Sequence, residues 1–396
     1  MKKYLYIIIT FIHVFQYISC VNPEVIVLSH YFSLSKGFIL IIRVGFPCDP
    51  ILINMNMALD KNVIIANEPY KSTESKTVQL LEKEPITFFN EELSSQKAND
   101  ILIISNKFNL TDFIFNIITE HEHYGTLGLA YKFKDESRSF LKLMKDKYLI
   151  DRMAFAFGPE NSEEDEGEVY FGGLPRAIKK GKEAATIKVK EKDQYWGCNL
   201  QYIYIGSEKE KGFAVKGFSY FQSNTKYIKV PQSFFSYLND NLFKEYILTQ
   251  ECFIIQTDTS KQFKCNCSVI KNFPTMTFVI DGIAFDFFNT ELFENYHYKT
   301  CDYYIMTDLT NKNNEWILGV SFYHNSYTLF DYEGKSIDFY REKRKFREDD
   351  VSLYLPKEEE EIETFHIKLY VLLFIVLLLI SDIIIIIINK YNNHLY

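Results

Sequence analysis

The sequence predicts a mainly β protein of two lobes, followed by one transmembrane helix. The chain has 396 residues, which is too long for one core and suits two lobes of roughly 150 residues each. Residues 23–340 consist mostly of short β-branched and aromatic runs, separated by clusters of Asn, Asp, Gly and Lys, as expected for strands joined by turns. Near the C-terminus, residues 369–388 form an apolar run of the length that crosses a bilayer.

Residues 1–20 predict a secretory signal peptide. Met1 and two lysines precede an apolar run over 4–18, which ends at Ser19 and Cys20, and this order is typical of such a signal. The alternative is an N-terminal membrane anchor, because Ile18 and Cys20 make a poor cleavage site. Both interpretations direct the chain into the secretory pathway.

Strands are predicted at the short apolar runs, and helical pattern is confined to two short stretches between them. These elements form an N-terminal lobe over 23–178 and a C-terminal lobe over 179–340. The clearest strands cover 38–42, 51–53, 101–104, 202–205 and 278–280, and the helices cover 139–147 and 232–243.

The C-terminal part of the chain predicts a membrane anchor. A charged segment over 341–368 is too polar to bury itself and predicts a flexible stalk. As a helix, the 369–388 run would span about 30 Å. Its Asp382 costs about 3 kcal/mol near the bilayer centre, which the flanking isoleucines offset. With a short polar tail over 389–396, the pattern predicts a single-pass type I membrane protein whose lobes are lumenal or extracellular.

Composition argues against several classes of partner. The net charge is −8 and no Lys/Arg-rich stripe with interleaved aromatic residues is present, so a nucleic acid partner is not expected. The sequence has no Gly-rich phosphate loop and no Cys/His cluster with zinc spacing, so we predict no metal and no cofactor. His121 and His123 are interpreted as part of a surface loop.

Seven cysteines are present, and six remain once Cys20 leaves with the signal peptide. An even number in a secreted chain favours disulfides. Cys252 and Cys265 flank a predicted hairpin and suit a bond across it. Asn109 opens an Asn-Leu-Thr sequon and is a predicted glycosylation site.

Five segments, in order along the chain, resemble the pepsin-like aspartic proteases. The resemblance covers residues 29–340 and is most specific near its C-terminal end. One such motif would be weak, whereas five in order are hard to obtain by chance. The segments are Val44-Gly45-Phe46-Pro47, Tyr124–Tyr131, Gly167–Gly173 with Tyr195-Trp196, the loop from Cys267 to Cys301, and Trp316–Gly319 with Tyr327–Asp331.

The resemblance implies a pepsin-like fold, in which two lobes enclose a substrate cleft. It also implies a disulfide between Cys267 and Cys301, as in the family's second-lobe loop, and a turn role for Asp331. Once the two hairpin cysteines are paired, elimination leaves a bond between Cys48 and Cys198.

The family's chemistry needs two carboxylates that share one proton, each in an Asp-Thr/Ser-Gly turn. Counting from Gly45 at the family's spacing places the first turn at Asn56-Met57-Ala58. Counting from Trp196 places the second at Gln222-Ser223-Asn224, which is followed by Thr225. Both aspartates are replaced by amides, which do not exchange a proton near neutral pH, so we predict no catalytic residue.

The two turns are the predicted cleft, and Phe88 and Phe89 lie near the tip of the flap that closes over it in the family. The family's flap carries Tyr-Gly-Thr-Gly, whereas the matching stretch here has no glycine. This departure agrees with the loss of both aspartates.

The resulting hypothesis is a membrane-anchored, catalytically inactive homologue that binds a peptide or protein partner. The alternative is an active membrane-anchored aspartic endopeptidase that uses Asp60 or Asp258. Asp258 begins an Asp-Thr-Ser triplet but lies nine residues before Cys267, which favours a polar hairpin tip. A third interpretation is a surface module with no ligand in its cleft.

Overall fold

The structure, a computed structural model, describes residues 26–349, apart from gaps at 34–36, 48–49, 67–69, 89–90, 106–107, 120–123, 160–165, 295–298, 311–313 and 342–345. The predicted signal peptide, transmembrane helix, tail and most of the stalk lie outside the described residues, as do Cys48, Phe89, His121 and His123. Among the helices that the structure describes, none has the length and apolar character needed to cross a membrane.

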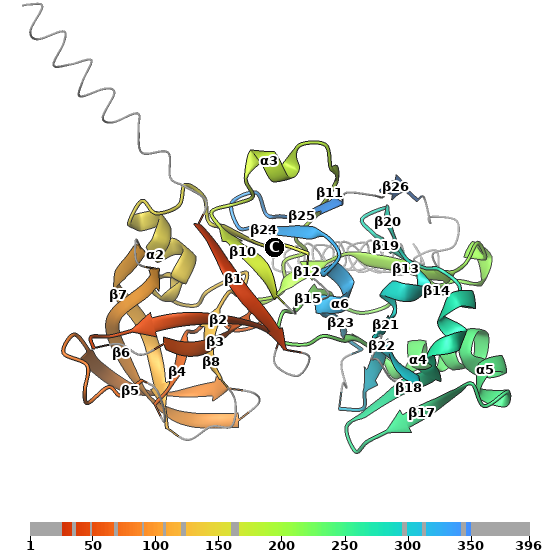
Figure 1. The fold of residues 1–396 in the computed structure, drawn as a ribbon, viewed down its shortest axis with the longest axis horizontal. Coiled ribbons are helices and arrows are strands. Elements are labelled where there is room, and N and C mark those ends of the chain that lie inside the picture. The colour runs from red at the N-terminus through yellow and green to blue at the C-terminus, as the bar shows by residue number, and fades with distance from the viewer. Residues whose placement is uncertain are drawn as a thin grey trace, which may run out of the picture. The chain divides into compact units, whose positions relative to one another are not determined.

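Strands dominate the described residues, so the prediction of a mainly β fold is confirmed. The largest sheet has 13 strands and joins strands from both ends of the chain (Figure 1). In spatial order these are β11 (Glu183–Lys188), β25 (Ser336–Arg341), β24 (Tyr327–Asp331), β9 (Ala154–Phe157), β10 (Glu166–Phe171), β1 (Ile26–Ser33), β2 (Gly37–Val44), β3 (Pro50–Asn56), β8 (Gly125–Gly128), β4 (Val63–Ile65), β7 (Phe108–Ile118), β6 (Glu91–Ser105) and β5 (Gln79–Phe88).

Two smaller sheets are formed by the C-terminal half of the described chain. The eight-stranded sheet contains β12 (Trp196–Cys198), β15 (Ser219–Phe221), β23 (Trp316–Leu318), β16 (Ile228–Val230), β22 (Thr300–Asp308), β18 (Ser260–Asn266), β17 (Cys252–Gln256) and β21 (Phe293–Glu294). The five-stranded sheet contains β14 (Phe213–Ala214), β13 (Leu200–Ile205), β19 (Met276–Ile280), β20 (Ile283–Phe287) and β26 (Arg347–Glu348). We call residues 37–128 the first lobe and residues 196–323 the second lobe; the remaining strands join them.

The two lobes repeat one strand arrangement. In the first lobe β3 runs parallel to β8, β8 is antiparallel to β4, and β4 runs parallel to β7. In the second lobe β15 runs parallel to β23, β23 is antiparallel to β16, and β16 runs parallel to β22. The ends of β3 and β15 are therefore equivalent positions.

Helices are short. The predicted helix at 139–147 is α2 (Phe140–Asp146), and Ser139 Oγ caps it by accepting a hydrogen bond from Lys142 N at 3.3 Å. The predicted helix at 232–243 is α4 (Gln232–Leu238), which continues as a π-helical segment (Asn239–Phe243) into α5 (Lys244–Leu248). The predicted lobe boundary at 178 and 179 lies in α3 (Arg176–Lys179), and α6 (Val320–Tyr323) follows β23.

Aromatic rings fill the junction between the lobes. Phe155 and Phe330 stack with ring centroids 5.0 Å apart, and Trp196 packs edge-on against both at 5.7 and 5.2 Å. All three side chains are fully buried, and burying a side chain of this size contributes about 1.5–3 kcal/mol. Trp196 Nε1 also donates to Leu129 O at 2.8 Å. This packing fixes the second lobe against the end of β8.

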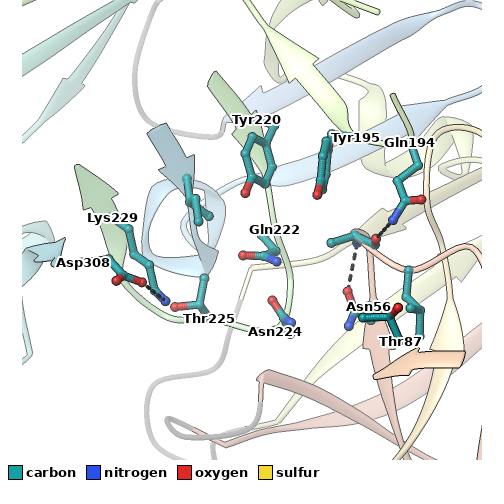
Figure 2. Close-up of a pocket in the computed structure, with 13 residues that line it drawn as sticks. Asn56, Thr87, Gln194, Tyr195, Tyr220, Gln222, Asn224, Thr225, Lys229 and Asp308 are labelled. Carbon is teal, nitrogen blue, oxygen red and sulfur yellow. Dashed lines mark hydrogen bonds and ion pairs between the residues drawn. The ribbon is translucent and has the colours of Figure 1, made fainter. Parts of the chain in front are cut away.

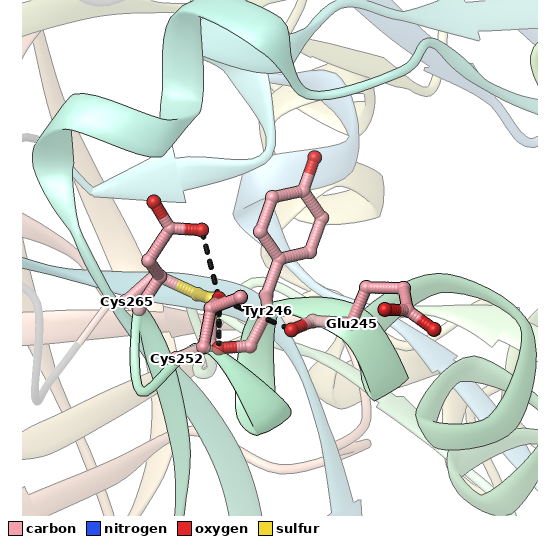
Figure 3. The surroundings of a disulfide bond; sticks show 6 residues. Glu245, Tyr246, Cys252 and Cys265 are labelled. Carbon is pink, nitrogen blue, oxygen red and sulfur yellow. Dashed lines mark hydrogen bonds between the residues drawn. A yellow bond between two sulfur atoms is a disulfide. The ribbon is translucent and has the colours of Figure 1, made fainter.

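Two of the predicted disulfides are present. Cys252 and Cys265 are opposite partners on β17 and β18, beside Tyr246 and Glu245 of α5 (Figure 3). The second bond joins Cys267 to Cys301. Disulfides persist in oxidising compartments, so this domain belongs in a lumenal or extracellular setting.

The third predicted disulfide, Cys48 to Cys198, does not form, because Cys198 is a free thiol. Cys198 lies on β12 opposite Ser219 and is buried in the core, and burial raises the pKa of its thiol. Elimination fails here because it assumes that every cysteine has a partner.

Candidate functional site

The first predicted turn begins where β3 ends. Asn56 is 7% exposed, and its Oδ1 accepts a hydrogen bond from Ala58 N at 2.9 Å, as a short polar side chain often does two residues ahead of itself in a turn. The carbonyl of Asn56 accepts from Leu129 N at 2.9 Å. Met57 points into the core and is fully buried.

The second predicted turn begins where β15 ends. Gln222 N donates to Leu318 O at 3.1 Å, and Thr225 O accepts from Val320 N at 2.9 Å. Ser223 is fully buried, whereas Gln222 and Asn224 are half-buried. A backbone hydrogen bond from Val320, the first residue of α6, thus holds the second turn, and one from Leu129, the residue after β8, holds the first turn.

One glycine in each lobe lets the chain cross close beneath its turn. A Cβ on Gly128 would lie 2.8 Å from Leu59 O, and a Cβ on Gly319 would lie 2.6 Å from Thr225 O. Real Cβ atoms do not come so close to backbone oxygens. Close backbone packing therefore explains the glycines at 128 and 319 in two of the five segments that resemble the family.

The two turns touch each other through Ser223. Its Oγ donates to Met55 O at 2.6 Å and accepts from Met57 N at 3.1 Å, both across the junction between the lobes. Met57 has no hydroxyl to make the reciprocal bonds. Tyr323 Oη donates to Gln222 O at 3.1 Å and lies 4.0 Å from Met57 Sδ, so a tyrosine also bridges the two turns.

A cavity of about 490 Å³ opens above the turns. Figure 2 shows the side chains of Gln222 and Asn224 between Lys229 and Thr225 on one side and Asn56 and Thr87 on the other. The wall consists mainly of amides and hydroxyls with one ion pair, and its members are Asn56, Ala58, Leu59, Thr87, Gln194, Tyr195, Tyr220, Gln222, Asn224, Thr225, Lys229, Asp308 and Ile317.

The family model described as eukaryotic aspartyl protease matches residues 92–341. The chain belongs to this family. The matched range contains the Gln222 turn and starts after the Asn56 turn, so the equivalence of the two turns depends on the strand arrangement described above. The prediction of a mainly β, pepsin-like fold is confirmed.

Individual relatives are distant. The chain is 27% identical to gastricsin of Callithrix jacchus over 222 residues, which cover 54% of this chain and 53% of that protein. It is 26% identical to human gastricsin over the same shares, and 27% identical to pepsin B of Canis lupus familiaris over 61% and 60%. The chain thus spans about half the length of the curated relatives it matches.

Charge in the cavity is confined to Lys229 and Asp308, among the residues that line it. Lys229 Nζ lies 3.5 Å from Asp308 Oδ2. Burial opposes ionisation of Asp308, but hydrogen bonds from Thr310 and the nearby Lys229 lower its pKa below the usual range. Burial, together with the charge of Glu315, raises the pKa of Tyr220. Its phenol is therefore neutral and can donate a hydrogen bond.

Of the two flap candidates, Phe88 lies within the described residues and Phe89 lies outside them. Strands β5 and β6 form a hairpin in which Phe88 is opposite Glu91. Phe88 is 1% exposed and packs in a small core with Val63 and Ile86, whereas Thr87 lines the cavity. Successive side chains of a strand point to opposite faces, so Thr87, which the sequence did not single out, is the hairpin residue at the site.

The aspartates that the alternative function needs lie elsewhere. Asp258 is exposed at the tip of the β17–β18 hairpin. Asp60 is 8% exposed, accepts from Lys134 N at 3.4 Å, and lines a neighbouring cavity of about 420 Å³. Asp331 accepts from Gly334 N at 2.9 Å, which is the turn role predicted for it. Within the described ranges no group of His, Cys, Asp and Glu could hold a metal ion.

Several wall residues could not be found from the sequence. Gln194, Tyr220, Lys229 and Asp308 belong to no motif. Tyr220, Lys229 and Asp308 meet because β15, β23, β16 and β22 are consecutive strands of one sheet, and Gln194 lies just before β12, the neighbour of β15. Tyr195 was noted as part of a family segment, and that was its only signal. Met57 and Ser223 lie beneath the cavity and serve the contact between the turns.

Proposed function

We propose that this family member is a non-catalytic peptide-binding protein that is anchored to a membrane. The observation that carries the proposal is the pair of amides, Asn56 and Gln222, at the ends of the equivalent strands β3 and β15. In the family's chemistry, one group accepts a proton from water while the other donates one. An amide does neither near neutral pH, and general acid–base catalysis is normally worth about 10²- to 10⁴-fold in rate.

The contact through Ser223 supports the alignment of the two turns. Its Oγ donates a hydrogen bond to Met55 O and accepts one from Met57 N, which are the backbone atoms on either side of Asn56. A shift of either turn by one residue would turn the wrong side chain toward the other lobe. We therefore infer that Asn56 and Gln222 occupy the positions of the family's two aspartates.

Retained binding is supported by the cavity itself. Its volume of about 490 Å³ falls in the range of ligand pockets, roughly 300–1,000 Å³. Amide and hydroxyl groups line it, and these match the alternating N–H and C=O groups of an extended peptide. We infer that the chain holds a peptide segment without cleaving it.

Membrane anchoring is inferred from sequence. The apolar run 369–388 and the signal-like segment 1–20 support a single-pass type I arrangement. The two disulfides agree with a lumenal or extracellular position for the lobes.

A cleavage and binding experiment tests the proposal. Full-length protein in detergent is incubated from pH 3 to 7 with a diverse peptide library, with and without a transition-state inhibitor of aspartic proteases. We expect retention of library peptides and no cleavage, with a known aspartic protease as the positive control. Cleavage that the inhibitor blocks would overturn the proposal and direct attention to Asp60 and Asp258.

A further inference from the structure

The centre of the cavity carries two neutral amides, Asn56 and Gln222, whereas the family's chemistry requires two carboxylates there. Two carboxylates would repel an acidic ligand, at about 4 kcal/mol for unit charges 4 Å apart at an effective dielectric constant of 20. Asn56 and Gln222 remove this repulsion and provide N–H donors instead. An acidic ligand group is therefore no longer excluded from the site.

The ammonium group of Lys229 lies at the second-lobe end of the same cavity. Lys229 on β16 has a side chain that is 27% exposed, and its Nζ is 3.5 Å from Asp308 Oδ2. An ammonium has three N–H groups, and one ion pair of this length occupies only one of them. Lys229 can therefore bind a second anionic group from the cavity.

Asp308 is better satisfied than Lys229. Its Oδ1 accepts from Thr310 N at 2.9 Å and from Thr310 Oγ1 at 2.5 Å, and its Oδ2 faces Lys229. A basic ligand at Asp308 would have to compete with these donors and would be repelled by Lys229. The pair thus favours an anionic ligand over a cationic one.

Neutral donors lie beside the cation. Gln222, Asn224 and Thr225 line the wall next to Lys229 (Figure 2). The Oδ1 atom of Asn224 is buried, with no partner among the described residues; as an acceptor it suits a backbone N–H of the peptide, whereas the Nδ2 amide is the group that can donate to a carboxylate. A carboxylate accepts several hydrogen bonds at once, and a ring of amide, hydroxyl and ammonium donors suits it.

We propose that the cavity selects a carboxylate of the bound peptide, with Lys229 as the specificity-determining residue. The carboxylate is either an Asp or Glu side chain or a free C-terminus, and the inference rests on the proposed peptide-binding function. Gln222, Asn224 and Thr225 supply the neutral hydrogen bonds around it.

Four labelled peptide libraries separate these sources. Each has random flanks around one fixed central residue: Glu, Gln or Lys with an amidated C-terminus, and Gln with a free C-terminal carboxylate. Fluorescence anisotropy gives the dissociation constant of each pool for the full-length protein. We expect the Glu pool or the free-carboxylate pool to bind at least tenfold more tightly than the amidated Gln pool, and the Lys pool to bind most weakly.

Lys229→Gln is the decisive variant, and Lys192→Gln is its matched control. Lys192 also pairs with a carboxylate, Glu315 at 3.7 Å, but does not line the cavity. Lys229→Gln should abolish the preference for carboxylate, measured as the ratio of the dissociation constants of the amidated Gln pool and the Glu or free-carboxylate pool, whereas Lys192→Gln should leave this ratio unchanged. For the Glu pool, the preference should also fade below about pH 4, where the ligand carboxyl takes up a proton.

The binding data distinguish a failure of the carboxylate inference from a failure of the peptide-binding proposal. Equal binding of the Glu, free-carboxylate and Gln pools, or a preference that survives in Lys229→Gln, overturns the carboxylate inference and leaves the peptide-binding proposal intact. If no pool binds, both fail.

Discussion

The turn at Asn56 and the turn at Gln222 have the same backbone setting and different side chains. Each follows the first strand of a parallel pair, and each is crossed closely by a glycine, Gly128 or Gly319. Yet a methionine lies at the centre of one turn and a serine at the centre of the other. Strand order and two close-approach glycines thus give both turns the same backbone setting, whereas the residues at the centres of the turns differ.

Two ion pairs of the molecule also differ in how deeply they are buried. In the second lobe Lys226 and Glu294 form an ion pair with side chains only 3% and 8% exposed. Arg138, which follows the first lobe in the chain, binds Glu84 of β5, whose side chain is 22% exposed, at 2.6 and 3.0 Å. One ion pair is sealed in the core, whereas the other links the flap strand β5 to the segment that follows the first lobe and is partly open to water.

The close-approach glycines should give the largest effects. Gly319→Ala places a Cβ 2.3 Å from Tyr227 O, and Gly128→Ala places one 2.7 Å from Lys61 O. Both contacts are with backbone, so overpacking should lower the free energy of unfolding by about 3 kcal/mol or more, with Gly319→Ala the worse. Urea unfolding measures this, and Gly158→Ala, whose nearest contact would be 3.3 Å, is the milder control. Equal stability of all three variants would contradict the shared packing role.

The two ion pairs should differ in strength. Glu294→Gln leaves the Lys226 ammonium buried without its carboxylate and should cost about 3 kcal/mol. Glu84→Gln should cost less, about 1–2 kcal/mol, because Arg138 keeps Asp135 at 3.2 Å and lies closer to water. The double variant Lys226→Met with Glu294→Leu should recover most of the loss. Chemical denaturation checks all three, and a larger loss at Glu84 would reverse the proposed order.

Loss of the central side chain in the second turn should cost more stability than a substitution in the first, because, among the described residues of the two turns, only Ser223 makes hydrogen bonds between the turns with its side chain. Ser223→Ala leaves Met57 N and Met55 O buried without their partner and should cost about 2 kcal/mol, whereas Ser223→Thr keeps the hydroxyl and should cost little. In the other turn Met57→Leu only exchanges apolar volume and should cost less than about 1.5 kcal/mol. Thermal unfolding of the three variants tests this, and a Met57→Leu loss as large as that of Ser223→Ala would argue against the asymmetry.

Acid should weaken the ion pair between Glu84 and Arg138. The hydrogen bonds from Arg138 lower the pKa of Glu84 to about 2, below the ordinary glutamate value of about 4.3. A lowered folded-state pKa gives stability that is complete above the unfolded-state pKa and is lost as pH falls toward 2. The difference in unfolding free energy between wild type and Glu84→Gln should therefore shrink between pH 5 and pH 2. A difference that stays constant over this range would contradict the assignment.

Sequence reasoning predicted what local pattern and counted spacing can determine. Short apolar runs marked the strands, and the count from Trp196 placed Ser223 at the position that contacts the other lobe. It missed Thr87 and Lys229, because the wall of a cavity depends on which strands pack side by side. It also paired Cys198 wrongly, because an even number of cysteines does not require that each one is bonded.

The affinity of a transition-state inhibitor of aspartic proteases, measured by calorimetry from pH 3 to 7, tests whether the two amides have replaced a proton-sharing pair of carboxylates. Wild type is compared with Asn56→Asp/Gln222→Asp, in which two carboxylates can again share a proton. We predict weak, pH-independent binding to wild type and at least tenfold tighter binding to the double variant at acidic pH. Tight binding to wild type that strengthens in acid would contradict this prediction.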